Sequence, residues 1–223
     1  MKKKILRSIR DHENLMSFLS VIYRAFMLNS VKKHKGLKIL GGGYFAKRTH
    51  VKNLGKDNTV EIEQGCRISN CNIQLFGNGN TVKIDHDCML KDLDIWISDG
   101  GSVHSGHNTY ISGKTHIACI EGKKVLIGAR CLFSNDITFR TGDSHSVLNL
   151  GGERINLAED ITIGNHVWIG QQVVILKGAF VGDDSIIGTR ALVTGKKFNG
   201  NVVIGGAPAR VIKTDVTWNH ELK

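Results

Sequence analysis

The sequence contains a single proline, few aromatic residues and no long uninterrupted apolar run. One proline against 26 glycines in 223 residues, with 41% hydrophobic residues, argues against a disordered or linker-rich chain. The N-terminal MKKKILRSIRDHENL lacks the apolar run that a secretory signal peptide requires. The best apolar stretch, VIYRAFML, is interrupted by Arg24 and is far too short to span a bilayer. We therefore expect a cytoplasmic protein with one substantial core.

Cysteine pairs and an excess of acidic charge are also missing. The five cysteines form no CxxC pair, so we expect neither a disulfide framework nor a metal site. Thirty Lys and Arg against 20 Asp and Glu give a net charge of +10, which attracts phosphate-bearing cofactors, acidic polysaccharides, nucleic acid or anionic lipids. The basic runs lack the interleaved aromatic residues on which bases stack, so nucleic acid is not an expected partner.

An N-terminal segment, residues 1–36, is predicted to contain one amphipathic helix over residues 11–35. The helix ends in VKKHKG, with cations in its last turn and Gly36 beyond them. We expect its apolar face to pack against the main domain or a partner subunit, and we rank contact with a membrane surface second. Five apolar residues share that face at helical spacing: Leu15, Phe18, Leu19, Ile22 and Phe26.

From about residue 54 the chain repeats a six-residue unit. The units IGNHVW, IGQQVV, ILKGAF, VGDDSI and IGTRAL follow one another without a gap, with an aliphatic first residue and a small or β-branched fifth residue. The unit recurs upstream as IEQGCR, IDHDCM, SGHNTY and IGARCL, whose starts lie 22, 21 and 22 residues apart. Three six-residue faces and a longer corner make one triangular coil of a parallel β-helix, which we place at residues 37–213, followed by a tail, residues 214–223.

In this register the first and fifth residues of each unit point inward. Cys66, Cys88 and Cys131 all occupy position five, and Thr109 takes the same place in the coil between them. We therefore expect one internal column in which the thiols act as small hydrophobic groups.

The repeat is interrupted once. Ile127 and Ile163 lie 36 residues apart, and the surplus falls in residues 140–160, which include RTGDSHSV. Long excursions from a regular scaffold are often functional, and this one presents His145.

The tandem units, HVWIG and VIGGAPARVIK resemble the hexapeptide-repeat acyltransferases. The resemblance implies an all-β, left-handed parallel β-helix that assembles as a homotrimer and uses acetyl-CoA. Within this group, FSNDITFRTGDSHSV, GERIN, ILKG and IKTDVTW are most similar to the capsular polysaccharide O-acetyltransferases, including those that act on polysialic acid. That specific match covers about residues 125–218, and it implies acetyl transfer to a hydroxyl of an acidic surface polysaccharide.

The resemblance also implies catalytic residues. The family's loop histidine, a general base, matches His145 in TGDSHS. Imidazole suits this work, because a sugar hydroxyl must lose its proton as it attacks a thioester near neutral pH. Asp143 is expected either to orient the imidazole or to shape the turn. Asn135 matches a family asparagine that holds the acceptor or the histidine, unless it is only a turn residue.

Trp168 occupies the outward sixth position of its unit, and the matching family tryptophan lies in the active site. Covering by a neighbouring subunit is the alternative.

The coenzyme is expected in a groove between two subunits, with its pantetheine amides near backbone groups of Gly170, Ala191 and Gly206. The cations expected at its phosphates, each of which could equally be a solvated surface residue, are Lys196, Lys197, Arg210 and Lys213.

These residues predict a direct transfer without a covalent acetyl-enzyme. Carbonic anhydrases of the γ class share the solenoid but need a His-x4-His pair, and none of the ten histidines has a partner five residues away. Two alternatives stay open. One is an acetyltransferase for a small sugar or amino acid, of the maltose, galactoside or serine type. The other is a non-catalytic solenoid that binds a partner, against which the loop histidine and the GAPARVIK tail count.

Overall fold

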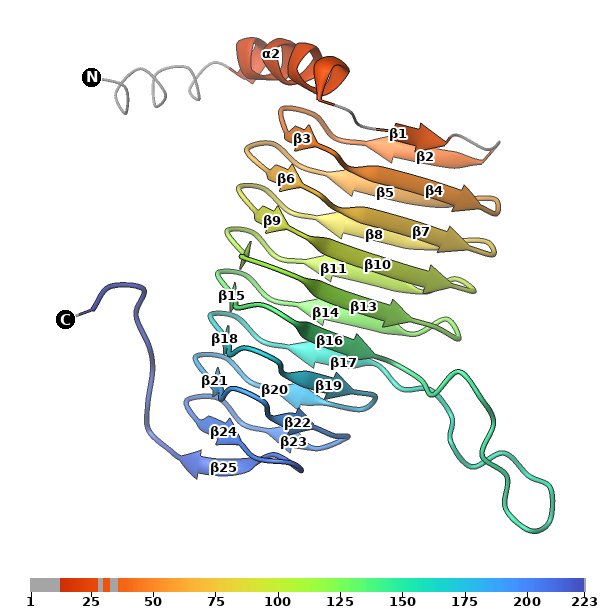
Figure 1. Ribbon diagram of the computed structural model, residues 1–223, viewed down its shortest axis with the longest axis vertical. Helices are drawn as coiled ribbons and strands as arrows, with labels where there is room; N and C mark the ends of the chain where they lie inside the picture. Colours follow the sequence, from red (N-terminus) through yellow and green to blue (C-terminus); the bar gives the residue numbers. More distant parts are fainter. Residues whose placement is uncertain (1–12, 28–29, 33–35, 223) are drawn as a thin grey trace.

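A computed structural model of the chain describes residues 13–27, 30–32 and 36–222. These residues form a parallel β-solenoid of three sheets with one helix at its N-terminal end (Figure 1). The predicted all-β parallel β-helix is confirmed. Each coil contributes one strand to each sheet in turn, so a strand pairs with the strands three before and three after it.

We call the sheets A, B and C. Sheet A contains β1 (Ser30–Lys32), β4 (His50–Leu54), β7 (Asn72–Phe76), β10 (Leu93–Ser98), β13 (Thr115–Cys119), β16 (Ile137–Arg140), β19 (Val174–Leu176) and β22 (Leu192–Val193). Sheet B contains β2 (Leu37–Leu40), β5 (Asn58–Ile62), β8 (Thr81–Ile84), β11 (Ser102–Ser105), β14 (Lys124–Ile127), β17 (Ile161–Ile163), β20 (Phe180–Val181) and β23 (Lys197–Phe198). Sheet C contains β3 (Phe45–Lys47), β6 (Arg67–Ser69), β9 (Met89–Lys91), β12 (Tyr110–Ile111), β15 (Leu132–Phe133), β18 (Trp168–Ile169), β21 (Ile186–Ile187), β24 (Val203–Gly205) and the antiparallel β25 (Arg210–Lys213).

The core follows the hexapeptide register. Ile163 and Val167, the first and fifth residues of one unit, are both buried, as the repeat predicts. The internal column of Cys66, Cys88 and Cys131 is confirmed, with Thr109 buried among them. Close stacking of the coils requires glycine at Gly170, where a Cβ would lie 2.7 Å from the backbone nitrogen of Thr189 in the next coil.

The N-terminal helix, α2 (Glu13–Phe26), is shorter than the predicted helix over residues 11–35. Of that range, residues 11–12, 28–29 and 33–35 lie outside the described residues. Ser30–Lys32 forms β1 and pairs with β4, so the solenoid begins before residue 37. These three residues make backbone hydrogen bonds to the next coil. Those bonds stabilise a strand more than the amphipathic pattern alone stabilises a helix, because a helix there would have no packing partner.

Of the two packing partners expected for the apolar face of α2, the main domain and a partner subunit, the structure shows that the main domain does not cover it. Its apolar residues are exposed, and its polar side contacts the first coil. Among the described residues, no helix is long and apolar enough to cross a bilayer.

The expected ejected loop leaves the solenoid between β16 and β17, at the corner between sheets A and B (Figure 1). Its outer part is a short hairpin in which Leu148 and Arg154 form a bridge. The coils stack across the excursion without interruption, because Val125 of β14 still pairs with Ile161 of β17. The loop is therefore an addition to a complete scaffold.

Candidate active site

Asn156 organises the loop that carries His145. Its buried side-chain amide donates to Asp143 Oδ2 at 2.9 Å and to the carbonyl oxygen of His145 at 2.7 Å. Its Oδ1 accepts from the backbone nitrogen of Val147 at 2.8 Å. These three bonds fix the backbone on both sides of His145. Sequence patterns do not single out Asn156, although it lies in the GERIN motif that contributes to the family resemblance.

Asp143 anchors this loop to the solenoid. Lys177, which follows β19, donates from Nζ to Asp143 Oδ2 at 2.5 Å and to the carbonyl oxygen of Asn156 at 3.2 Å. The bonds from Lys177 and Asn156 lower the pKa of the Asp143 carboxyl. Within the described residues its partners are these two side chains and not the His145 ring, which supports the turn-shaping interpretation over imidazole orientation.

A second anchor joins the loop to the neighbouring corner. The Arg154 guanidinium donates to both carboxylate oxygens of Glu121, at 2.9 and 2.7 Å. This bidentate pair lowers the pKa of Glu121. The loop is thus held to the solenoid at two points, Asp143 before the hairpin and Arg154 within it.

Acid is expected to release the loop before the coils unfold. Both carboxyls have folded pKa values below their usual range, so their stabilisation is complete above the ordinary carboxyl pKa of about 4 and is lost as the pH falls through the lowered values. Hydrogen exchange with mass spectrometry, corrected for intrinsic rates, should show loop peptides losing protection at a higher pH than coil peptides. Asp143→Asn should remove part of this pH dependence. Loop protection that persists until the coils unfold would contradict the expectation.

His145 projects from the loop and is exposed. In the part of the chain that the structure describes, its imidazole has no hydrogen bond or ion pair. Both ring nitrogens are therefore accessible to a substrate, while the backbone that carries the ring is fixed.

Trp168 lies on sheet C and is 42% exposed, as its outward position predicts. Trp218 from the tail lies beside it, with ring centroids 6.1 Å apart. The Trp218 ring stacks on His166 at 4.3 Å, and its Nε1 donates to the carbonyl oxygen of His166 at 2.7 Å. The sequence motif containing Trp218 contributes to the resemblance without predicting a role for it. The structure adds this residue to the aromatic surface around Trp168.

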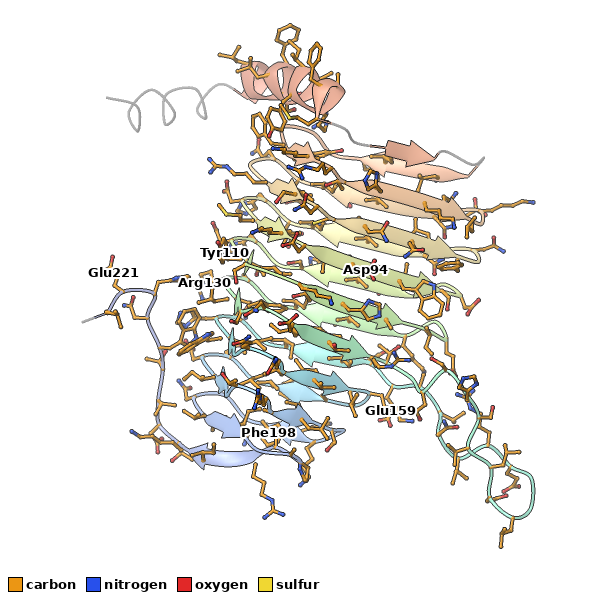
Figure 2. The ribbon with its side chains drawn as sticks, viewed as in Figure 1. Asp94, Tyr110, Arg130, Glu159, Phe198 and Glu221 are labelled. Atoms are coloured by element: carbon orange, nitrogen blue, oxygen red, sulfur yellow. The ribbon has the colours of Figure 1, made fainter. Side chains whose placement is uncertain are left out.

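One chain does not bring His145 and Trp168 together. The loop leaves the corner between sheets A and B, and sheet C is the opposite face of the prism. Figure 2 shows the arrangement: Glu159 at the base of the loop lies on one side, and Tyr110 of sheet C lies on the other. Asn135 lies at a third place, the corner between sheets C and A, where Asp136 accepts its amide at 3.3 Å.

The backbone groups expected to hold pantetheine are partly engaged already. The amide nitrogen of Gly170 donates to Ile187 O at 2.8 Å, and that of Ala191 donates to Gly188 O at 3.2 Å. The first bond joins two stacked coils and the second closes a turn within one coil, so both amides serve the solenoid. Gly206 is exposed, and its carbonyl oxygen accepts from Leu192 at 2.9 Å.

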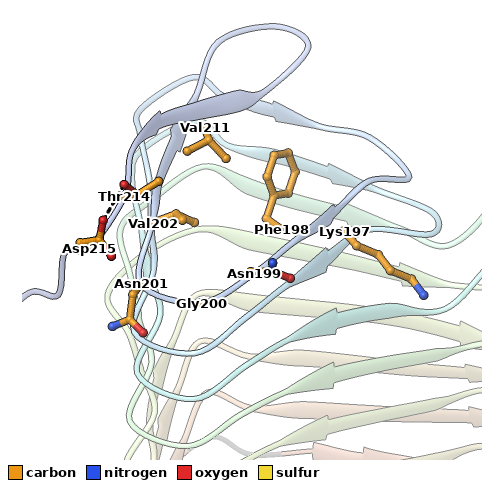
Figure 3. Close-up of a pocket in the computed structure, with 9 residues that line it drawn as sticks. All are labelled: Lys197, Phe198, Asn199, Gly200, Asn201, Val202, Val211, Thr214 and Asp215. Atoms are coloured by element: carbon orange, nitrogen blue, oxygen red, sulfur yellow. Dashed lines mark hydrogen bonds between the residues drawn. The ribbon is translucent and has the colours of Figure 1, made fainter.

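The cations expected at the coenzyme phosphates lie at the C-terminal end of the solenoid. Lys197 lines a hollow of about 350 Å³ together with Phe198 and Val211 (Figure 3). The other three cations are exposed near this end: Lys196, Arg210 and Lys213.

The comparison with known proteins agrees with this arrangement. No family model matches the chain. The polysialic acid O-acetyltransferase of Neisseria meningitidis is 33% identical over 180 residues, which cover 78% of this chain and 81% of the relative. The galactoside O-acetyltransferase of Escherichia coli K12 is 38% identical over 121 residues, which cover 53% and 57%.

Two solved structures share the fold over most of their length. The polysialic acid-specific acetyltransferase NeuO matches with a TM-score of 0.81 and 27% identity, covering 86% of this chain and 89% of NeuO. The polysialic acid O-acetyltransferase OatWY matches with a TM-score of 0.67 and 28% identity, covering 86% and 93%. The chain therefore belongs to the hexapeptide-repeat O-acetyltransferase family that includes the polysialic acid O-acetyltransferases.

Proposed function

We propose that this O-acetyltransferase moves the acetyl group of acetyl-CoA to a hydroxyl of an acidic, sialic acid-containing surface polysaccharide. The observation that carries the proposal is a fixed loop that presents an unengaged histidine, His145, in a chain whose relatives over most of its length acetylate polysialic acid. The net charge of +10 suits both substrates, because coenzyme A and polysialic acid are polyanions.

In the proposed reaction His145 accepts the proton of the acceptor hydroxyl as its oxygen bonds to the thioester carbonyl carbon. A backbone N–H stabilises the resulting oxyanion. As the carbon–sulfur bond breaks, the imidazolium returns the proton to the departing sulfur, which leaves an acetyl ester and free coenzyme A thiol. His145 ends in its starting state, so no second nucleophile is needed.

The cysteines support direct transfer, because all five are buried. A hydrogen bond with Cys66 lowers the pKa of the Cys88 thiol, which is only 1% exposed. Burial raises the pKa of the Cys131 thiol to about 12 and those of Cys71 and Cys119 to about 11. A thiol in such a place is a poor nucleophile at neutral pH.

Thiol reagents are therefore expected to leave the enzyme active. The native protein should keep its full activity after treatment with N-ethylmaleimide and should show no fast-reacting thiol towards a disulfide reagent. After denaturation all five cysteines should react. Inactivation that follows the labelling of one cysteine would contradict direct transfer and point to an acetyl-enzyme.

We also propose a homotrimer in which the loop of one protomer faces sheet C of the next. The opposite placement of His145 and Trp168 supports this, since a site that uses both needs two copies. Exposed apolar side chains on the loop also need cover. They are Val147, Leu148, Leu150, Ile155 and Leu157.

The acceptor is tested with isotopically labelled acetyl-CoA and a panel of acceptors read by mass spectrometry. The panel contains oligosialic acid, other capsule fragments, maltose, a galactoside and serine. We expect label on oligosialic acid. Label on the galactoside alone would favour the second candidate, a small-sugar acetyltransferase, which the E. coli relative supports over a shorter part of the chain.

A further inference from the structure

Helix α2 is attached to the solenoid by its polar side. The side chain of Ser20 is fully buried. The Arg24 guanidinium donates to the carbonyl oxygen of Tyr44 at 2.7 Å and lies 4.0 Å from the centre of the Tyr44 ring. Tyr23 meets Phe45 of β3 edge to face, with ring centroids 5.4 Å apart. These contacts fix which side of the helix faces the first coil.

The opposite side of α2 is an apolar surface that no described residue covers. Phe18 is 63% exposed and Phe26 is 77% exposed. Figure 2 shows side chains standing off the side of α2 that is remote from the sheets. The remaining members of this surface are Leu15, Leu19, Val21 and Ile22. A continuous exposed apolar surface of this kind marks a contact with another molecule or with lipid.

The sequence on both sides of α2 is strongly basic. Residues 2–10 contain Lys2, Lys3, Lys4, Arg7 and Arg10, and residues 32–35 contain three more lysines. An apolar helical face flanked by cations is the pattern of helices that lie in the interface of anionic bilayers. Each cation near such a surface strengthens binding about fivefold. Two copies meeting through this face would instead bring their cations together.

We propose that this end of the protein docks on an anionic lipid bilayer, with the apolar face of α2 inserted among the lipid headgroups. In sheet C, β18 lies five strands beyond β3, and strands stand about 4.8 Å apart, so Trp168 would stand about 24 Å from β3, the strand of sheet C nearest to α2. A long glycan could reach that height. This last consequence rests on the proposed function, whereas the lipid contact does not.

The test is flotation of the full chain with vesicles of phosphatidylcholine alone or mixed equally with phosphatidylglycerol. We expect binding to the mixed vesicles, weakened by salt, and at least tenfold less binding to the neutral vesicles. Phe18→Ser with Phe26→Ser should lower the bound-to-free ratio about tenfold or more, because both side chains leave the apolar face. Lys2→Gln, Lys3→Gln and Lys4→Gln together should lower it about a hundredfold at low salt.

Matched controls remove exposed apolar or cationic groups at places away from α2. Leu222→Ser removes an even more exposed apolar side chain, and Lys196→Gln with Lys197→Gln removes two distant cations; both variants should leave flotation unchanged within about threefold. The proposal is overturned if the wild-type protein does not bind the mixed vesicles, or if the double serine variant binds them as well as the wild type does. If the wild-type protein does not bind vesicles and the double serine variant forms smaller assemblies, the apolar face of α2 mediates contacts between copies of the chain instead. Acetylation of soluble oligosialic acid by the double serine variant separates a failure of docking from a failure of the proposed function.

Discussion

His145→Ala is expected to lower kcat by about 10²- to 10⁴-fold, the usual contribution of a positioned general base. The substitution removes the proposed proton acceptor but none of the bonds that hold the loop, because Asn156 binds the backbone oxygen of residue 145 and not its imidazole. The affinity for coenzyme A, measured by calorimetry, should therefore change little. A loss confined to kcat separates a missing base from a disordered site.

His107→Ala is the matched control. His107 lies at the corner between sheets B and C, away from the loop, where its ring stacks on that of His86 with centroids 4.8 Å apart. Its removal should leave kcat within about twofold, as for an ordinary surface substitution. If His145→Ala kept its activity, the base would lie elsewhere and the loop would have a structural role only.

Two inactive variants are expected to restore activity when they assemble together. The His145→Ala variant lacks the proposed base and keeps Trp168, whereas the Trp168→Ala variant lacks the indole and keeps His145. If each site takes His145 from one protomer and Trp168 from the next, co-expression in equal amounts leaves about a quarter of the sites intact. The mixed protein should then show about a quarter of the wild-type kcat per site, against nearly none for either variant alone.

Co-expression gives a different result if one chain holds both residues. Every site would then carry one defect, and the mixture would be as inactive as its parts. An assembly mass other than that of three chains would also contradict the proposed homotrimer. Mixing the two variants after separate purification controls for slow exchange of protomers.

Sequence alone determined the solenoid, because a coil is a local and repeated structure. The first and fifth residues of each six-residue unit face the core in every coil, as Ile163 and Val167 do, so the repeat is enough to place them. The 36-residue spacing between Ile127 and Ile163 also revealed the loop, since a repeat exposes any surplus in its length. His145 could be identified within it from the family motif.

Tertiary structure decided the contacts between residues distant in the chain. Nothing local predicts that Lys177 anchors Asp143, 34 residues away, or that Trp218 stacks on His166, 52 residues away. An amphipathic pattern predicts that a helix has an apolar face, but not what that face meets. On α2, Ser20 is buried and Arg24 donates to Tyr44 of the first coil, and the apolar side is left exposed. The physical reason is that periodicity encodes which residues share a face, whereas the partner of a face depends on shape and charge across the whole molecule.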